Sequence, residues 1–265
     1  MRVISKVSYR MLQVMKNAAD LVLPKVCVVC GDRLMKHERT ICLHCLADMP
    51  MTHFWDRAHN DMADRFNSVI QHGLEESWER MGEPCMDRAP EKYAYAAALF
   101  FYSHEAPYRH ILYNLKYEGR VDVGRYFGRM LGTKLAASAE FRDVDCVIPV
   151  PLHQLRRWRR GYNQAEVIAQ EVAAALNAPL RCDMLRRKRR TKTQTKLDIN
   201  GKAENVAGAF EVRMMETENA TSVRHILLID DVFTTGSTLY ACFEALRIVF
   251  PPTVRISVAT LAFVG

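Results

Sequence analysis

The sequence predicts an α/β protein in which a mostly parallel central sheet is covered by helices on both faces, with a small zinc-binding module before it. From residue 93 onward, apolar strand-like runs alternate with segments of helical periodicity. One of these runs ends in two adjacent carboxylates and a turn of small residues. Near the start of the chain, four cysteines form two C-x2-C pairs.

The composition is that of a globular protein, with 265 residues of which 49% are hydrophobic and 25% are charged. It excludes a disordered chain, a collagen-like fibre and a coiled-coil rod. The net charge of +7 is unevenly distributed, because residues 151–202 hold 13 basic and 4 acidic residues. This basic segment indicates an acidic partner, with a solvated basic face as the alternative.

We expect four parts in the chain. Residues 1–23 are predicted to form an amphipathic helix that packs on the protein or a partner, with contact to a membrane surface as the alternative. Residues 24–50 form the zinc module, residues 51–92 an irregular connector with room for a short helix, and residues 93–265 the α/β domain. Strands are expected at 94–102, 144–150, 206–212, 225–231 and 254–261, and helices at 107–117, 123–137, 163–176 and 237–250.

No membrane span or secretory signal is expected. The longest uncharged apolar run, Tyr93 to Tyr102, has half of the roughly 20 residues that a spanning helix needs. Charged residues such as Lys6 and Arg10 interrupt the apolar stretch that a signal peptide would require. We therefore expect a cytoplasmic protein.

The four N-terminal cysteines are Cys27, Cys30, Cys42 and Cys45. Two C-x2-C turns complete a tetrahedral zinc site with four thiolates, and a site with all four positions filled is structural. Redox-active CxxC pairs without metal are the alternative. His37 and His44, in or beside the module, are expected to be surface histidines. The other four cysteines are expected to be free thiols, of which the last three are buried: Cys85, Cys146, Cys182 and Cys242.

The segment from Leu227 to Thr238 carries the strongest chemical signal. Its strand delivers Asp230 and Asp231 to the carboxyl edge of the sheet, where open α/β folds bind ligands. The following turn and helix start combine a conformationally free glycine, hydroxyls and backbone amides that can surround a phosphate, in Thr234, Thr235, Gly236, Ser237 and Thr238. Carboxylates a few residues from a phosphate-binding turn suit a ligand with hydroxyls beside its phosphate, so a phosphorylated sugar is expected. The lysine of a P-loop and the three glycines of a dinucleotide site are missing. A capped helix beside a solvated aspartate pair is the alternative.

This segment closely resembles the phosphoribosyl-pyrophosphate (PRPP) motif of type I phosphoribosyltransferases. Other stretches narrow the resemblance to the ComF family: Leu115-Lys116-Tyr117-x-Gly119-Arg120, Val147 to Pro151, Arg160 to Gln164, Thr193-Gln194-x-x-Leu197, Asn205 to Phe210 and the four-cysteine module. The resemblance covers roughly Pro24 to the C-terminus. Two features depart from the family: Lys202 stands where an arginine is expected, and many members shorten the acidic 51–92 connector or equip it with further cysteines.

The resemblance implies a type I phosphoribosyltransferase fold that binds PRPP with Mg²⁺ and transfers phosphoribosyl to an acceptor, releasing pyrophosphate. Asp230 and Asp231 would then hold the ribose hydroxyls and act in catalysis, and Thr234 to Thr238 would bind the 5′-phosphate. A loop at 149–164 and a mobile loop at 186–205 would contact pyrophosphate. Together with Lys116, which lies outside both loops, the residues expected to bind pyrophosphate or belong to the closing loop are Arg157, Arg160, Arg190, Lys192 and Lys202.

A non-catalytic role is the alternative, because ComF proteins are associated with natural competence and DNA uptake. The Arg156 to Tyr162 stretch interleaves aromatic and cationic residues as single-strand binders do, and Arg186 to Arg190 suits phosphates of any sequence. In this interpretation the protein binds single-stranded DNA or DNA-processing proteins, and the PRPP site is a sensor or a relic. Tyr162 would either stack on a base or serve packing. The sequence leaves the acceptor and the oligomeric state open.

Overall fold

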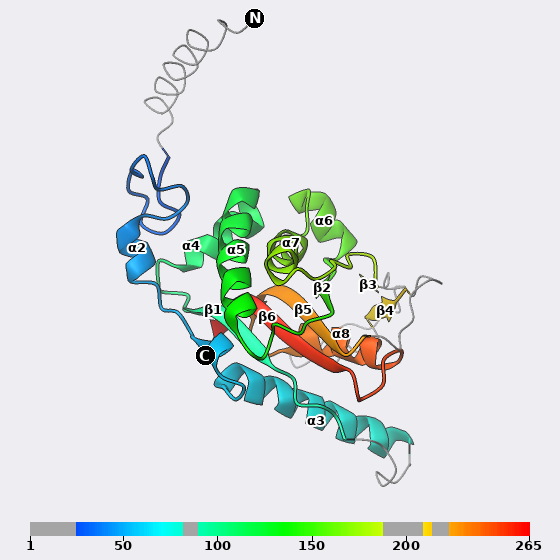
Figure 1. Cartoon of the computed structure of the whole chain (residues 1–265). Coiled ribbons are helices and arrows are strands. Elements are labelled where there is room, and N and C mark those ends of the chain that lie inside the picture. Colours follow the sequence, from blue (N-terminus) through cyan, green and yellow to red (C-terminus); the bar gives the residue numbers. More distant parts are fainter. Residues whose placement is uncertain (1–24, 82–89, 188–208, 214–222) are drawn as a thin grey trace, which may run out of the picture.

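The computed structural model describes residues 25–81, 90–187, 209–213 and 223–265. Its centre is a four-stranded sheet in the order β1-β6-β5-β2, in which every neighbouring pair is parallel. The strands are β1 (Ala96–Tyr102), β2 (Cys146–Pro149), β5 (His225–Phe233) and β6 (Arg255–Val264) (Figure 1). The α/β fold with a parallel sheet is therefore confirmed.

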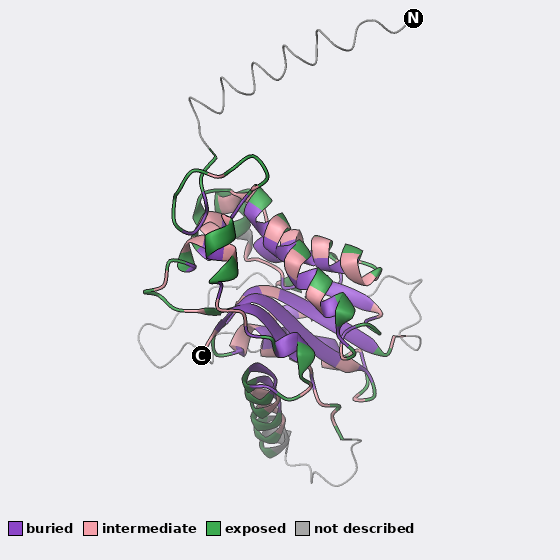
Figure 2. Cartoon of the chain, turned by 60° about the vertical axis from the view of Figure 1, so that its left-hand side comes forward, coloured by how far each residue is buried: buried purple, intermediate pink, exposed green. Residues whose placement is uncertain are grey.

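Helices cover both faces of this sheet (Figures 1 and 2). The crossover from β1 to β2 contains α4 (Arg109–Tyr117) and α5 (Val121–Ala137), and α6 (Gln154–Arg160) and α7 (Gln164–Leu176) follow β2. Helix α8 (Ser237–Arg247) connects β5 to β6 and lies on the face opposite α5 and α7. Because both faces are covered, β5 and β6 are almost continuously apolar and buried.

The prediction of an irregular connector is wrong for much of residues 51–92. The structure has a helix of 21 residues there, α3 (Asp61–Met81). Met62, Phe66 and Ile70 recur at every fourth position and are at most 1% exposed, so one narrow stripe packs on β1 and α8. Asn60 caps the start of α3, accepting from the Ala63 N–H at 3.0 Å. The acidic and polar residues of the remaining face conceal this stripe in the sequence.

A second difference concerns residues 149–164, expected as a loop. They contain α6, because residues 154–160 lack glycine, proline and β-branched side chains. Beyond α7, β3 (Leu185–Arg187) and β4 (Phe210–Val212) pair antiparallel as a separate two-stranded sheet. The short elements α2 (Leu43–Ala47) and η1 (Phe54–Asp56) lie before α3.

Some expectations concern particular residues or parts of the chain. Cys146 and Cys242 are buried as expected, whereas Cys182 is exposed because it lies in a surface bend before β3. Cys85 and the helix expected at 1–23 lie outside the described residues. Within the described part of the chain, no helix is long and apolar enough to cross a membrane.

Candidate functional site

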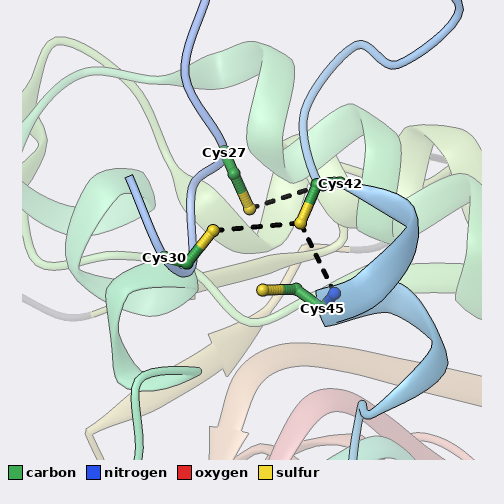
Figure 3. A group of neighbouring side chains, drawn as sticks. All are labelled: Cys27, Cys30, Cys42 and Cys45. Carbon is green, nitrogen blue, oxygen red and sulfur yellow. Dashed lines mark hydrogen bonds between the residues drawn. The ribbon is translucent and has the colours of Figure 1, made fainter. Parts of the chain in front are cut away.

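The four N-terminal cysteines converge on one point (Figure 3). Their sulfur atoms all lie within 4.8 Å of one another, and those of Cys30 and Cys42 are 3.8 Å apart. A tetrahedron with Zn–S bonds of about 2.3 Å has sulfur–sulfur edges of about 3.8 Å. The residues therefore fit a zinc ion with four thiolate ligands.

Backbone N–H groups donate hydrogen bonds to two of these sulfur atoms and stabilise negative charge on them. Cys27 Sγ accepts from the N–H groups of Val29 and Cys42, each at 3.4 Å, and Cys42 Sγ accepts from the N–H of Cys45 at 3.4 Å. Although burial alone would raise it, the pKa of Cys27 is lowered to about 7 by backbone N–H donors. Burial raises the pKa of Cys45, so a bound cation would be needed to hold all four thiolates.

The nearby histidines do not join this cluster. His37 and His44 are both exposed, and the ring of His44 lies 3.3 Å from the carboxylate of Asp48. This agrees with the prediction of surface histidines.

At the opposite end of the described chain, β5 runs into a turn that opens directly into α8. Gly236 is the N-cap of α8 with φ of +79°, and a Cβ there would lie 2.9 Å from the Phe233 ring. Only glycine adopts this conformation without strain. The hydroxyls of Thr235 and Ser237 lie 2.9 Å apart at the mouth of the turn. The turn and the start of α8 line a small cavity of about 30 Å³, with Thr234 and Thr238 also in its wall.

The two carboxylates before this turn have different surroundings. Asp231 is buried, and its carboxylate lies 3.0 Å from Lys116 Nζ at the end of α4. Asp230 is half-buried and accepts from the Asp231 N–H at 2.8 Å. Burial and the neighbouring Asp231 charge raise the pKa of Asp230 to about 7. The pair therefore combines a carboxylate held by a cation with one that exchanges a proton near neutral pH.

The end of α4 also meets the segment between α6 and α7. The Tyr162 hydroxyl donates to the Leu115 carbonyl, which supports the packing role for this tyrosine. The Arg160 guanidinium lies 5.3 Å from the centre of the Tyr117 ring and donates to Gln164 Oε1 at 3.0 Å. The last turn of α4 therefore contacts both the arginine segment and the aspartate pair.

Of the six residues expected to contact pyrophosphate, the structure describes three, and these lie in different surroundings. Lys116 pairs with Asp231, Arg160 lies beside Tyr117, and Arg157 lies 3.2 Å from Glu166. The pyrophosphate role of all three stays a prediction. Arg190, Lys192 and Lys202 lie outside the described residues.

A larger cavity of about 460 Å³ lies beside the aspartate pair, and the sequence did not reveal it. Its walls come from α4, from the ends of β1 and β6 and from the residues after Asp231, so residues far apart in the chain line it. The lining residues are Tyr102, His104, Arg109, His110, Leu112, Tyr113, Lys116, Tyr117, Val232, Thr234 and Val264. The Leu115-Lys116-Tyr117 stretch was the available signal, but it touches only part of one wall.

Comparison with known proteins agrees with this geometry. Residues 163–263, which run from α7 to the end of β6, match the phosphoribosyl transferase domain family. The chain is 31% identical over 140 residues to competence protein F of Haemophilus influenzae, a match that covers 52% of this chain and 60% of that protein.

Two further relatives extend the comparison. The DNA utilization protein YhgH of Escherichia coli (strain K12) is 24% identical over 217 residues, covering 81% of this chain and 80% of that protein. Competence protein ComFC of Bacillus subtilis is 30% identical over 95 residues, covering 36% of this chain and 35% of that protein. The resemblance to the ComF family is confirmed, and the chain carries a phosphoribosyltransferase domain with a four-cysteine cluster near its N-terminus.

Proposed function

We propose that the protein binds PRPP together with Mg²⁺ at the end of β5 and transfers the phosphoribosyl group to an acceptor, releasing pyrophosphate. The observation that supports this most is the arrangement of Asp230 and Asp231 directly before a turn of hydroxyls capped by Gly236. Carboxylates suit ribose hydroxyls, and hydroxyls with the N-terminal amides of an 11-residue helix suit a phosphate.

In this function each group has a separate task. The turn from Thr234 to Thr238 binds the 5′-phosphate and places the ribose over the edge of the sheet. Asp230 and Asp231 accept from the 2′ and 3′ hydroxyls. Lys116 fixes the orientation of Asp231 from α4, because its ammonium lies 3.0 Å from that carboxylate.

The transfer forms a bond from the acceptor nucleophile to C1′ and breaks the bond from C1′ to the pyrophosphate oxygen, which leaves with the electron pair. Positive charge develops on the ribose in an oxocarbenium-like transition state, and the two aspartates stabilise it. Their carboxylate oxygens are ligands that Mg²⁺ prefers, so the site fits this ion. When bound, Mg²⁺ would neutralise charge on the pyrophosphate.

Calorimetric titration with PRPP and Mg²⁺ tests the proposal. We expect binding to the wild type and at least about tenfold weaker binding when both Asp230→Asn and Asp231→Asn are present, because each hydrogen bond to a charged group contributes roughly 1.5–3 kcal/mol. Asp122→Asn is the matched control, since Asp122 on α5 pairs with Arg120 just before that helix. Equal affinity of the double variant and the wild type, or absence of binding to either, would contradict the site assignment.

The cysteine cluster supports a structural zinc ion. All four ligand positions are filled by thiolates, so no position is left for a substrate. In this proposal zinc stabilises the module and takes no part in the transfer.

Binding of single-stranded DNA is a second candidate, supported by one surface feature. Trp158 on α6 is 84% exposed between arginines that are themselves exposed, Arg157 and Arg159. Bases stack on such rings while the cations contact phosphates. The expected result is binding of a single-stranded oligonucleotide that weakens steeply with salt and weakens further in Trp158→Ala. Binding that changes neither with salt nor with this substitution would exclude single-stranded DNA binding at this surface.

A further inference from the structure

The 460 Å³ cavity beside the aspartate pair has the size of a small-molecule site. It shares Lys116 and Thr234 with the proposed PRPP site, and Val232 directly follows Asp231 in its wall. A molecule in this cavity would therefore lie next to the ribose of a bound PRPP.

Aromatic and aliphatic groups form most of the cavity wall. Tyr113 and Tyr117 are 50% and 65% exposed, so part of each ring is open to a ligand even though the Arg160 guanidinium lies 5.3 Å from the centre of the Tyr117 ring. Their ring centres are 5.2 Å apart with planes tilted by 45°. Leu112 and Val232 add aliphatic surface. Such a wall favours a flat aromatic ring, which gains from burial and from contact with other rings.

The charges of the wall are positive. Arg109 and Lys116 line the cavity, and none of its described lining residues is acidic. The Asp231 carboxylate lies 3.0 Å from Lys116 Nζ and offsets the charge of that lysine. Arg109 is held at the wall by a hydrogen bond that its Nη1 donates to the His104 carbonyl. An arginine has five N–H donors in a planar fork, an arrangement that matches a carboxylate or phosphate.

We propose that this cavity binds a planar aromatic ring that carries an anionic group, with the ring against Tyr113 and Tyr117 and the anion on Arg109. This rests on the proposed function in one respect, namely that the ligand is the acceptor of the phosphoribosyl group. The binding chemistry itself follows from the wall alone.

Calorimetric titration with 2-naphthoate and its neutral isostere 2-naphthamide tests the proposal on the full-length protein. We expect naphthoate to bind at least several-fold more tightly than naphthamide. Arg109→Gln should weaken naphthoate about tenfold, the effect of losing one charge-assisted contact, and leave naphthamide unchanged. Tyr113→Ala should weaken both probes, because it removes part of the ring surface.

Arg129→Gln is the matched control, since Arg129 lies on α5 and pairs with Glu171. Circular dichroism confirms that each variant is folded. Equal affinity for the two probes, absence of binding, or an Arg109→Gln effect equal to that of Arg129→Gln would overturn the proposal. PRPP binding is measured in a separate titration. Loss of PRPP binding with retained naphthoate selectivity would reject the transferase function and keep the anionic aromatic site.

A nucleotide within a single strand offers the same chemistry, because its base lies next to a phosphate. Thymidine 5′-monophosphate and a decathymidylate are therefore titrated in the same way. If the mononucleotide and the decathymidylate bind with comparable affinity, the natural ligand of the cavity is a free small molecule. An oligonucleotide that binds more tightly and loses that advantage in Arg109→Gln identifies a base of a strand. If neither nucleotide probe binds while naphthoate does, the source is a small aromatic acid.

Discussion

His225 begins β5, at the edge of the sheet opposite the aspartate pair, and is 2% exposed. One ring nitrogen lies 2.9 Å from Asp143 Oδ1 and the other 2.8 Å from Ser257 Oγ, which also accepts from the Tyr95 N–H. A neutral ring satisfies both partners when Nδ1 carries the proton. Although Asp143 opposes the shift, burial lowers the pKa of His225. With Ser257 at 0% exposed, this Ser–His–Asp arrangement serves stability rather than nucleophilic attack.

This residue predicts a pH dependence of stability. Below the pKa of about 6.5 that an unfolded histidine has, the unfolded chain binds a proton that the folded chain resists, so the free energy of unfolding falls as pH falls. The raised pKa of Asp230 acts in the opposite direction below pH 7. Urea denaturation of wild type and His225→Asn between pH 5 and 7.5 isolates the histidine. The variant should lose up to about 1.4 kcal/mol per pH unit less than the wild type as pH falls. Parallel curves would contradict the assignment.

At the scale of elements, α5 and α7 pack closely because α5 presents glycines to α7. A Cβ at Gly132 would lie 2.8 Å from Ala175 Cβ and 3.0 Å from Val172 Cα. A Cβ at Gly128 would lie 3.1 Å from Ile168 Cα. Just before α7, the Tyr162 hydroxyl donates to the Leu115 carbonyl near the end of α4.

Gly132→Ala should therefore destabilise the protein, although alanine stabilises an exposed helix by up to about 1 kcal/mol relative to glycine. The added methyl group meets backbone as well as a side chain, and we expect a loss of about 1–3 kcal/mol. Thr133→Ala is the control, because Thr133 is exposed on the same helix. Thermal and urea denaturation measure both variants. A Gly132→Ala protein as stable as the control would show that α5 and α7 separate at no cost.

Elements with strong local patterns were predictable from the sequence. The run that ends in Asp230 and Asp231 is apolar because both faces of the sheet are covered, and Asn163 marks the start of α7 by accepting from the Ala165 N–H. Helix α3 was missed because its buried stripe is narrow. The 460 Å³ cavity was missed for another reason, since only parallel pairing of β1 with β6 and β6 with β5 brings Tyr102 and Val264 beside Val232.

At the scale of the whole molecule, the cysteine module and the α/β domain share one hydrophobic core, to which Cys27, Ile41 and Cys45 belong. The end of the module runs along β1, with the Phe101 N–H donating to the Pro50 carbonyl at 2.8 Å. The hydroxyl of buried Tyr108, just before α4, donates to the Cys45 carbonyl at 2.9 Å. Helix α4 thus joins the cysteine cluster at one end to Asp231 at the other.

This connection predicts that zinc stabilises the α/β domain as well as the module. Metal analysis should find about one zinc per chain, and its removal by a chelator should lower the Tm of the whole protein, because zinc binding is coupled to folding. Tyr108→Phe should cost about 1 kcal/mol in the zinc-loaded protein, the net value of one hydrogen bond. After chelation the same substitution should lower the free energy of unfolding by less. Without zinc the Cys45 carbonyl is free to bond to water in place of the Tyr108 hydroxyl. Tyr126→Phe on α5 controls for loss of a tyrosine hydroxyl. If Tyr108→Phe costs the same with and without zinc, the cluster and α4 are not coupled through this bond.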